Sequence, residues 1–198
     1  MRDEWNVMRE IIETQRLLIK PLTEADAEFI LPVYEGSADY LDTQTPDEPS
    51  IDMVRADMTL AVQHDSIYGG IFRRDTNQPI GVISFVPKNF RGQRDYAWLS
   101  LLMIQEGDRL EGYGAEAYVA VEDFIFRDEA VTRIGTLLIP QFDASLRFAE
   151  KMGFEQAGGP FKNKRGYGLY SFVKKRAGAP ETAGEAAWRE AKKVKSDK

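Results

Sequence analysis

Residues 109–118 read RLEGYGAEAY and place two glycines, Gly112 and Gly114, directly before a strongly helical stretch. Glycine lets a chain turn tightly and lets a ligand approach the backbone without a Cβ in the way. The first N–H groups of a helix have no partner inside the helix, so a helix that begins here could hold an anion. The same glycines also suit an ordinary strand-to-helix turn, and on this stretch alone both interpretations stay open.

Two nucleotide-binding loops do not fit this stretch. Position 117 is Ala, so the spacing G-x-G-x-x-G of a dinucleotide fold is absent. The sequence also contains no G-x-x-x-x-G-K-[ST] loop. We therefore expect neither a dinucleotide nor a nucleoside triphosphate at this helix start.

The segments around the loop alternate between strand and helix patterns. Three β-rich runs precede it, at about 67–73, 80–87 and 95–104, and turn residues separate them. A long helix, a buried strand in VTRIGTLLIP, a helix that ends at Gly153 and a last strand in YGLYSFVKK follow it. Near the N-terminus we expect a strand at about 15–20 and helices that begin after Thr23 and Ser50. This order predicts an α+β domain whose mixed sheet combines an antiparallel meander with a parallel crossover, flanked by helices.

The composition excludes several kinds of chemistry. The 198 residues contain no Cys and one His, His64, which excludes disulfides, thiolate zinc sites, Cys nucleophiles and multi-histidine metal sites. We expect no metal. Carboxylates, hydroxyls, amines or backbone groups must do any chemistry.

The charge is unevenly distributed along the chain. The net charge is −6, yet residues 174–198 hold 8 Lys/Arg against 4 Asp/Glu, so the body is strongly acidic. An acidic body disfavours nucleic acid as a partner and suits a cationic amine. There is no apolar run long enough for a membrane span and no secretory signal, so we expect a cytoplasmic protein with no membrane partner. We divide the chain into one domain, 1–175, and a charged Ala/Lys-rich tail, 176–198, that is mobile or a short helix.

Three motifs together resemble one family. Arg109, Gly112, Gly114 and Ala115 form R-x-x-G-x-G-A between a strand and a helix, which resembles the acyl-CoA pyrophosphate loop, [QR]-x-x-G-x-[GA], of the GNAT superfamily of N-acetyltransferases. TQRLLIKPLTEADA is similar to the opening strand and helix of its ribosomal-protein-type (RimJ/RimL-like) branch, and DASLRFAEKMGF resembles a later helix. The resemblance spans about residues 12–174.

The resemblance implies direct attack of a primary amine on the thioester of acetyl-CoA, without a covalent intermediate. The family's cofactor lies between two splayed strands, here about 97–104 and 132–138, with amides near Met103 and Ile104 holding the thioester carbonyl. Arg109 would supply local positive charge to the pyrophosphate. The amides that would cradle it are those of Leu110, Gly112, Tyr113, Gly114 and Ala115.

The acid and the base are harder to identify. In many relatives a tyrosine of the later helix faces the departing thiolate, and Ala149 occupies that position here. The ribosomal-type branch offers a serine, matched by Ser145, which could hydrogen-bond the CoA sulfur or simply cap backbone amides. Glu106, at the end of the cofactor-facing strand, is the candidate base, with a solvated loop carboxylate as its alternative. A frequent family asparagine is replaced by Phe142.

The acceptor side rests on three tyrosines, Tyr34, Tyr40 and Tyr170, each of which could line a substrate pocket or serve as packing. The acceptor is a small-molecule amine or a protein N-terminus, and the resemblance favours a homodimer. Glu111, beside Gly112, opposes the charge of a pyrophosphate, and Arg147 or Lys151 could compensate. A non-catalytic acyl-CoA-binding or regulatory module is therefore the alternative function.

Overall fold

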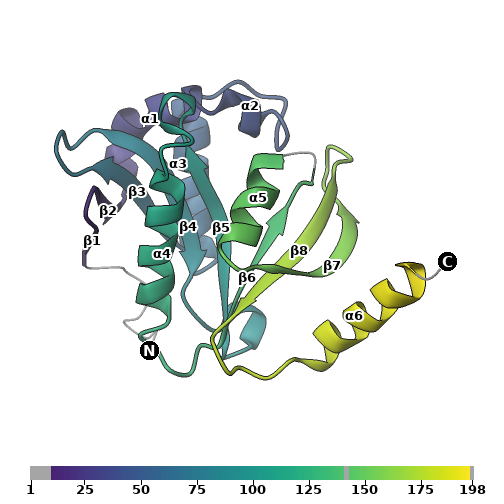
Figure 1. The fold of residues 1–198 in the computed structure, drawn as a ribbon. Coiled ribbons are helices and arrows are strands. Elements are labelled where there is room, and N and C mark those ends of the chain that lie inside the picture. Colours follow the sequence, from purple (N-terminus) through teal and green to yellow (C-terminus); the bar gives the residue numbers. More distant parts are fainter. Residues whose placement is uncertain (1–9, 141–142, 197–198) are drawn as a thin grey trace.

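The computed structural model describes residues 10–140 and 143–196 and contains one eight-stranded sheet in the order β1-β2-β3-β4-β5-β6-β8-β7 (Figure 1). Every neighbouring pair is antiparallel except β5 and β6, which the helix α4 connects in parallel. The predicted α+β fold with a mixed sheet is confirmed. The strands are β1 (Ile12–Glu13), β2 (Leu17–Pro21), β3 (Ile67–Arg73), β4 (Pro79–Val86), β5 (Tyr96–Ile104), β6 (Arg133–Leu138), β7 (Glu155–Lys162) and β8 (Gly168–Lys175).

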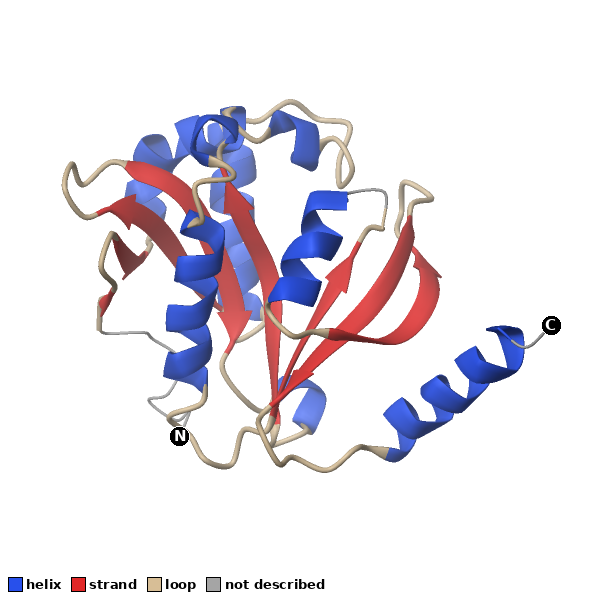
Figure 2. Ribbon diagram, viewed as in Figure 1, coloured by secondary structure: helices blue, strands red, loops and turns tan. Residues whose placement is uncertain are grey.

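Helices cover both faces of the sheet (Figure 2). In the view of Figure 1, α4 and α5 lie in front of the strands, whereas α1 and α3 lie behind them. The short α2 lies above the opening between β5 and α5. The helices are α1 (Ala27–Glu35), α2 (Ala38–Leu41), α3 (Ile51–Gln63), α4 (Tyr113–Ile125), α5 (Asp143–Lys151) and α6 (Ala183–Ser196).

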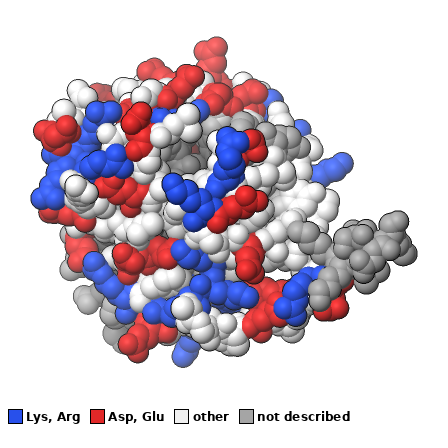
Figure 3. All heavy atoms as spheres, viewed as in Figure 1, with Lys and Arg blue, Asp and Glu red and all other residues white. Residues whose placement is uncertain are grey.

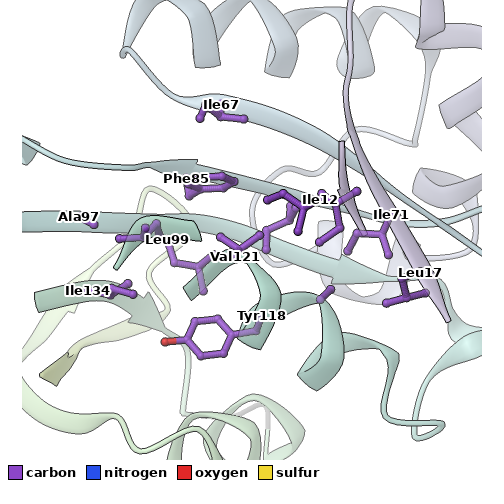
Figure 4. Close-up of a cluster of buried hydrophobic side chains, with 14 of the residues drawn as sticks. Ile12, Leu17, Ile67, Ile71, Phe85, Ala97, Leu99, Tyr118, Val121 and Ile134 are labelled. Atoms are coloured by element: carbon purple, nitrogen blue, oxygen red, sulfur yellow. The ribbon is translucent and has the colours of Figure 1, made fainter. Parts of the chain in front are cut away.

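The sheet separates two hydrophobic cores. In β3, Ile67 and Ile71 pack in the core under α4, while Tyr68 and Phe72 pack in the core under α1 and α3. Successive side chains of a strand point to opposite faces, so one strand serves both cores. Figure 4 shows Val121 of α4 packed against the strands of the first core. A sheet buried on both faces explains the continuous apolar runs of β3 and β4.

Capping residues in the sequence correctly predicted the start of α3 and the end of α5. The side chain of Ser50 caps α3 by accepting the N–H of Met53 at 3.2 Å, as predicted. Gly153 follows α5 with φ of +81°, in the left-handed region where glycine is favoured, as predicted for a helix stop. These capping interactions depend on a few neighbouring residues, which is why sequence reasoning finds them.

Several elements were not expected from the sequence. The strand β7 reads EQAGGPFK, and its two glycines and proline give it low strand propensity, yet it pairs with β8 along its length with two register shifts. The elements β1 and α2 are two and four residues long, too short for a periodic signal. The tail, expected to be mobile or a short helix, contains the 14-residue α6, which contacts β7 and extends beyond the sheet in Figure 1. Within residues 10–140 and 143–196, no helix has the length and apolarity needed to cross a bilayer.

Candidate active site

The strands β5 and β6 separate partway along their length. They pair only at Tyr96–Arg133, Ala97–Ile134 and Trp98–Gly135. On the other edge of β5, Leu99 lies opposite Phe85 and Leu101 opposite Ser84, so Ser100 is an extra residue in the strand. Such a bulge bends a strand and increases its twist. The bulge falls where pairing ends, so the expected gap between strands 97–104 and 132–138 is present.

A cavity of about 490 Å³ occupies this gap. Its walls come from α2 and the residues after it, β5, the loop before α4, β6 and α5. Most lining side chains are apolar, which suits the long aliphatic part of a ligand. The hydroxyl groups that line it belong to Tyr40, Ser100, Thr136 and Ser145.

The ladder between β4 and β5 decides which backbone groups face the gap. The N–H of Gln105 donates to the carbonyl of Ile80 at 3.0 Å, whereas the carbonyl of Ile104 accepts the Nε of Arg109 at 2.7 Å. Alternate residues of an antiparallel strand direct their backbone groups to opposite edges. Leu102 and Ile104 therefore direct theirs into the gap. Met103 lines the cavity, but its amide faces β4, so the amides that face the gap are those of Leu102 and Ile104, and the sequence analysis did not single out Leu102.

The loop before α4 exposes backbone N–H groups. Leu110 and Gly112 have φ of +67° and +82°, and this left-handed geometry turns the chain into the helix. The first hydrogen bond of α4 runs from Glu116 N–H to the Gly112 carbonyl at 3.0 Å. In the described part of the chain, the N–H groups of Gly112, Tyr113 and Gly114 donate to no protein acceptor. A helix start with free N–H groups is suited to an anion.

The cation at this loop is Arg16, which the sequence did not indicate. Its Nη1 donates to the carbonyl of Glu111 at 3.0 Å, and its guanidinium lies 4.4 Å from the ring centre of Tyr113. The guanidinium of Arg73 lies 5.3 Å from the same ring. Figure 3 shows basic side chains gathered at the left edge of this face, among acidic ones. The fold thus brings Arg16 and Arg73 to an acidic loop that lies 95 residues from Arg16 at Glu111 and 35 residues from Arg73 at Asp108.

Arg109 contacts α2 and the end of β5. Its Nη1 and Nη2 donate to the two carboxylate oxygens of Asp39 at 2.6 and 2.8 Å, and its Nε bonds the Ile104 carbonyl. All these contacts lie on the cavity side of the loop, because both Asp39 and Arg109 line the cavity. Arg109 is thus directed toward α2 and the end of β5 in this structure.

One face of α5 closes the cavity. Ser145, Phe148 and Ala149 all line it, at the spacing of neighbouring turns. Ala149 is buried, and its small side chain stands at the position where the resemblance led us to expect a tyrosine. Arg147 instead pairs with Asp143 on the exposed side of α5, and neither it nor Lys151 lines the cavity. Phe142 lies outside the described residues.

The structure does not support Glu106 as a base. The 3₁₀ turn Glu106–Asp108 leads the chain away from β5, which leaves the Glu106 side chain exposed and outside the cavity lining. Its N–H donates to the Gly36 carbonyl at 2.7 Å, which ties the turn to the end of α1. The buried carboxylate of this turn is Asp108, which accepts the Nε of Arg73 at 3.1 Å.

The three tyrosines have three different positions. Tyr40 lines the cavity, as the acceptor-site prediction requires. Tyr34, on α1, is fully buried in the core between α1, α3 and β3 and is not among the cavity-lining residues, and its hydroxyl bonds Asp57 and Tyr68. Tyr170 packs against the first core, whereas its neighbour Leu169 lines the cavity. Adjacent strand residues face opposite sides, so the prediction for Tyr170 missed by one position.

The cavity between the two splayed strands lies beside the free N–H groups of a helix start, an arrangement suited to a ligand with a long apolar arm and an anionic group. Residues 16–155 match the family description "Acetyltransferase (GNAT) domain", which covers most of the chain. The chain belongs to the GNAT superfamily of N-acetyltransferases.

Individual relatives agree with this family. The chain is 32% identical over 158 residues to "Uncharacterized N-acetyltransferase YoaA" of Bacillus subtilis (strain 168), across 76% of this chain and 86% of the relative. The fold is similar to that of a Salmonella typhimurium acetyltransferase that modifies the N-terminal serine of ribosomal protein L7/L12. The TM-score is 0.70 at 16% identity, and the match covers 84% of this chain and 99% of the Salmonella chain. The structure of aminoglycoside acetyltransferase AAC(6')-Ib with coenzyme A is similar as well, with a TM-score of 0.64 and 19% identity. This match covers 81% of this chain and 95% of the aminoglycoside acetyltransferase chain.

Proposed function

We propose that this protein transfers an acetyl group from acetyl-CoA to a primary amine by direct attack within a ternary complex. The observation that carries the proposal is the gap that opens in the sheet after the Trp98–Gly135 pair. A pantetheine arm in this gap would lie against the backbone groups of Leu102 and Ile104, which face no neighbouring strand. The pyrophosphate would then meet the N–H groups at the start of α4 and the guanidinium of Arg16.

The reaction needs the residues of the gap in two roles. A neutral amine nitrogen bonds to the thioester carbon, and the carbonyl oxygen takes up negative charge that a β5 amide can stabilise. The C–S bond then breaks, and the CoA sulfur leaves with the electron pair. Ser145 lines the cavity from the first turn of α5 and is our candidate to hydrogen-bond that sulfur. The amine proton passes to solvent, because Glu106 lies outside the cavity.

Turnover and cofactor binding test this function separately. Calorimetry with CoA measures binding, and release of free thiol from acetyl-CoA in the presence of a primary-amine panel measures the reaction. We expect micromolar CoA binding and a loss of about tenfold or more in kcat for Ser145→Ala. Ser171→Ala, on β8 outside the cavity lining, is the matched control. An unchanged rate for Ser145→Ala would remove Ser145 from the mechanism.

A non-catalytic CoA-binding module is the second candidate function. It is favoured by Ala149, which lines the cavity without an acidic hydroxyl. Tight CoA binding without thiol release from any amine of the panel would establish this alternative. Absence of CoA binding at millimolar concentration would refute both functions.

A further inference from the structure

The domain has two halves, one on each side of the gap. The first half contains β1 to β5 with α1 to α4, and the second contains β6, β7, β8 and α5. Within the sheet the halves pair from Tyr96–Arg133 to Trp98–Gly135, and beyond that last pair the cavity separates them. Because the sheet joins the halves at one end only, a contact between them at the other, open end has a large influence on the width of the gap.

Residues 37–48, which we call the strap, lie at this open end. Leu41 of the strap is buried in the core under α1 and α3, so the strap is anchored on the first half. Tyr40 and Gln44 of the strap line the cavity. Figure 1 shows α2, which is part of the strap, above the opening between β5 and α5. The strap therefore forms part of the cavity wall at the open end.

Asn163 of the second half reaches the strap with a directed hydrogen bond. It lies in the turn between β7 and β8, and its Nδ2 donates to the carbonyl of Thr43 at 3.0 Å. Thr43 is buried, and its hydroxyl donates to the carbonyl of Tyr40 at 2.7 Å and accepts the Nε2 of Gln44 at 3.0 Å. The bond from Asn163 thus acts on the residue that is bonded to both cavity-lining neighbours.

The same amide organises its own turn. Its Oδ1 accepts the N–H of Arg165 at 3.0 Å and the N–H of Tyr167 at 2.9 Å. These two donors fix the orientation of the amide, because only its oxygen can accept them. The Nδ2 is therefore directed towards Thr43. One side chain connects the turn of the second half to the strap of the first.

Arg165 of this turn also reaches the strap, but with a weaker contact. Its Nη2 lies 3.4 Å from Oδ1 of Asp42, whose side chain is 68% exposed. Exposed ion pairs contribute little to stability. The partly buried bond from Asn163 to the Thr43 carbonyl is therefore the contact to test.

We propose that Asn163 is a positioning residue that holds the two halves of the domain together over bound CoA. The inference rests on the proposed function for the identity of this ligand. Without the bond to Thr43 the halves can separate at the open end, and binding must bring them together again. The apparent affinity then falls with the fraction of molecules in the closed form. Asn163 is not among the cavity-lining residues, so its effect reaches the ligand through the strap.

Two substitutions remove this bond and keep the turn. Asn163→Asp retains an oxygen for the N–H groups of Arg165 and Tyr167 but has no N–H to donate to Thr43. Asn163→Ser also retains an oxygen that can accept within a turn, and it is uncharged. Agreement between the two variants separates the lost hydrogen bond from the added charge. Asn89→Asp makes the same charge change in the exposed turn after β4, at the joined end of the sheet, and is the matched control.

Calorimetry and steady-state kinetics measure the effect on the cofactor. Both Asn163 variants should raise the Kd of CoA about threefold to tenfold, which is the range that one net hydrogen bond supplies. The KM for acetyl-CoA should rise by the same factor, while kcat changes less than about twofold, because the closed complex is unaltered. The control should change none of these values. Thermal denaturation midpoints close to that of the original protein check that the turn is intact.

A distance measurement tests closure without any ligand. The chain contains no Cys, so cysteines introduced at the exposed Glu48 and Lys162 carry spin labels at these two positions alone. Glu48 ends the strap, and Lys162 ends β7. We expect a narrow distance distribution between the labels when Asn163 is present. In both Asn163 variants the distribution should broaden and shift to longer distances.

Three results would overturn the role of Asn163. The first is an unchanged distance distribution in both variants, and the second is an unchanged Kd of CoA in both. The third is an effect in Asn163→Asp alone, which would assign it to the added charge. Failure of the original protein to bind CoA would refute the proposed function, whereas the label distances still judge the contact between Asn163 and the strap.

Discussion

The Nε of Arg16 lies 2.6 Å from Oε2 of Glu116, and this ion pair joins the turn before β2 to the first turn of α4. Oε1 of Glu116 also accepts the hydroxyl of Thr14 at 2.6 Å and the N–H of Arg16 at 2.9 Å. Contacts between residues 100 and 102 positions apart thus stabilise the loop that contains Gly112. The loop geometry therefore depends on contacts that lie outside the motif itself.

Glu116→Gln should destabilise the protein in a pH-dependent way. Burial raises the pKa of Glu116, but hydrogen bonds from Thr14 and Arg16 outweigh it and hold this pKa below its ordinary value of 4.5. A lowered folded-state pKa gives stability that is fully present above the unfolded-state value and lost as the pH falls through the folded-state value. We expect Glu116→Gln to cost about 1–2 kcal/mol at pH 7.

The difference from the original protein should shrink as the pH falls below about 4.5, and urea denaturation at several pH values measures it. Glu10→Gln is the control, since Glu10 forms an exposed pair with Arg127. A constant difference across the pH range would contradict the role of the Glu116 charge.

Arg16→Gln should weaken CoA binding. Its guanidinium is the cation that contacts the Glu111 carbonyl at the start of α4, where we place the pyrophosphate. Loss of one charge-assisted contact to a phosphate is expected to raise the Kd of CoA about tenfold, measured by calorimetry. Arg127→Gln removes a similar charge beyond the far end of α4 and should leave the Kd unchanged. If Glu116→Gln raised the Kd as much as Arg16→Gln does, Arg16 would act only by holding the loop.

Gly112→Ala should strain the loop. Gly112 has φ of +82°, where a Cβ costs about 1 kcal/mol or more, and its ideal Cβ would lie 3.5 Å from Nη2 of Arg16. We expect lower stability in urea and a severalfold higher Kd for CoA. The matched control is Gly107→Ala, whose Cβ would meet no atom within 4 Å and whose φ is ordinary. Equal effects of the two substitutions would argue against a special backbone at Gly112.

Tyr34→Phe should lower stability without a direct effect on the cavity. The Tyr34 hydroxyl donates to Oδ2 of Asp57 at 2.7 Å and bonds the hydroxyl of Tyr68 between α1, α3 and β3. Its removal leaves the half-buried Asp57 carboxylate with one donor fewer, at a cost of about 1–3 kcal/mol. Urea denaturation of Tyr34→Phe, Asp57→Asn and the double variant forms a cycle. Strictly additive effects would show that the two side chains are not coupled.

The sequence by itself determined the features that depend on local chemistry. The periodicity of the chain indicated the meander, the crossover and the helices that flank them, and Ser50 and Gly153 fixed helix ends. The motif around Gly112 also indicated the family, because backbone freedom and free N–H groups at a helix start are local properties.

The tertiary structure decided the features that depend on residues distant in the sequence, or on which side of a strand a residue faces. The bulge at Ser100 follows from register against β4, and it opens the cavity. The alternation of residues along β5 directs the amide of Leu102, and not that of Met103, into the gap. The alternation along β8 places Leu169, and not Tyr170, in the cavity lining. Partner choice is likewise nonlocal, because a charged side chain pairs with whichever opposite charge the fold brings near. Arg109 therefore pairs with Asp39, and Arg16 is the guanidinium that contacts the loop at the Glu111 carbonyl.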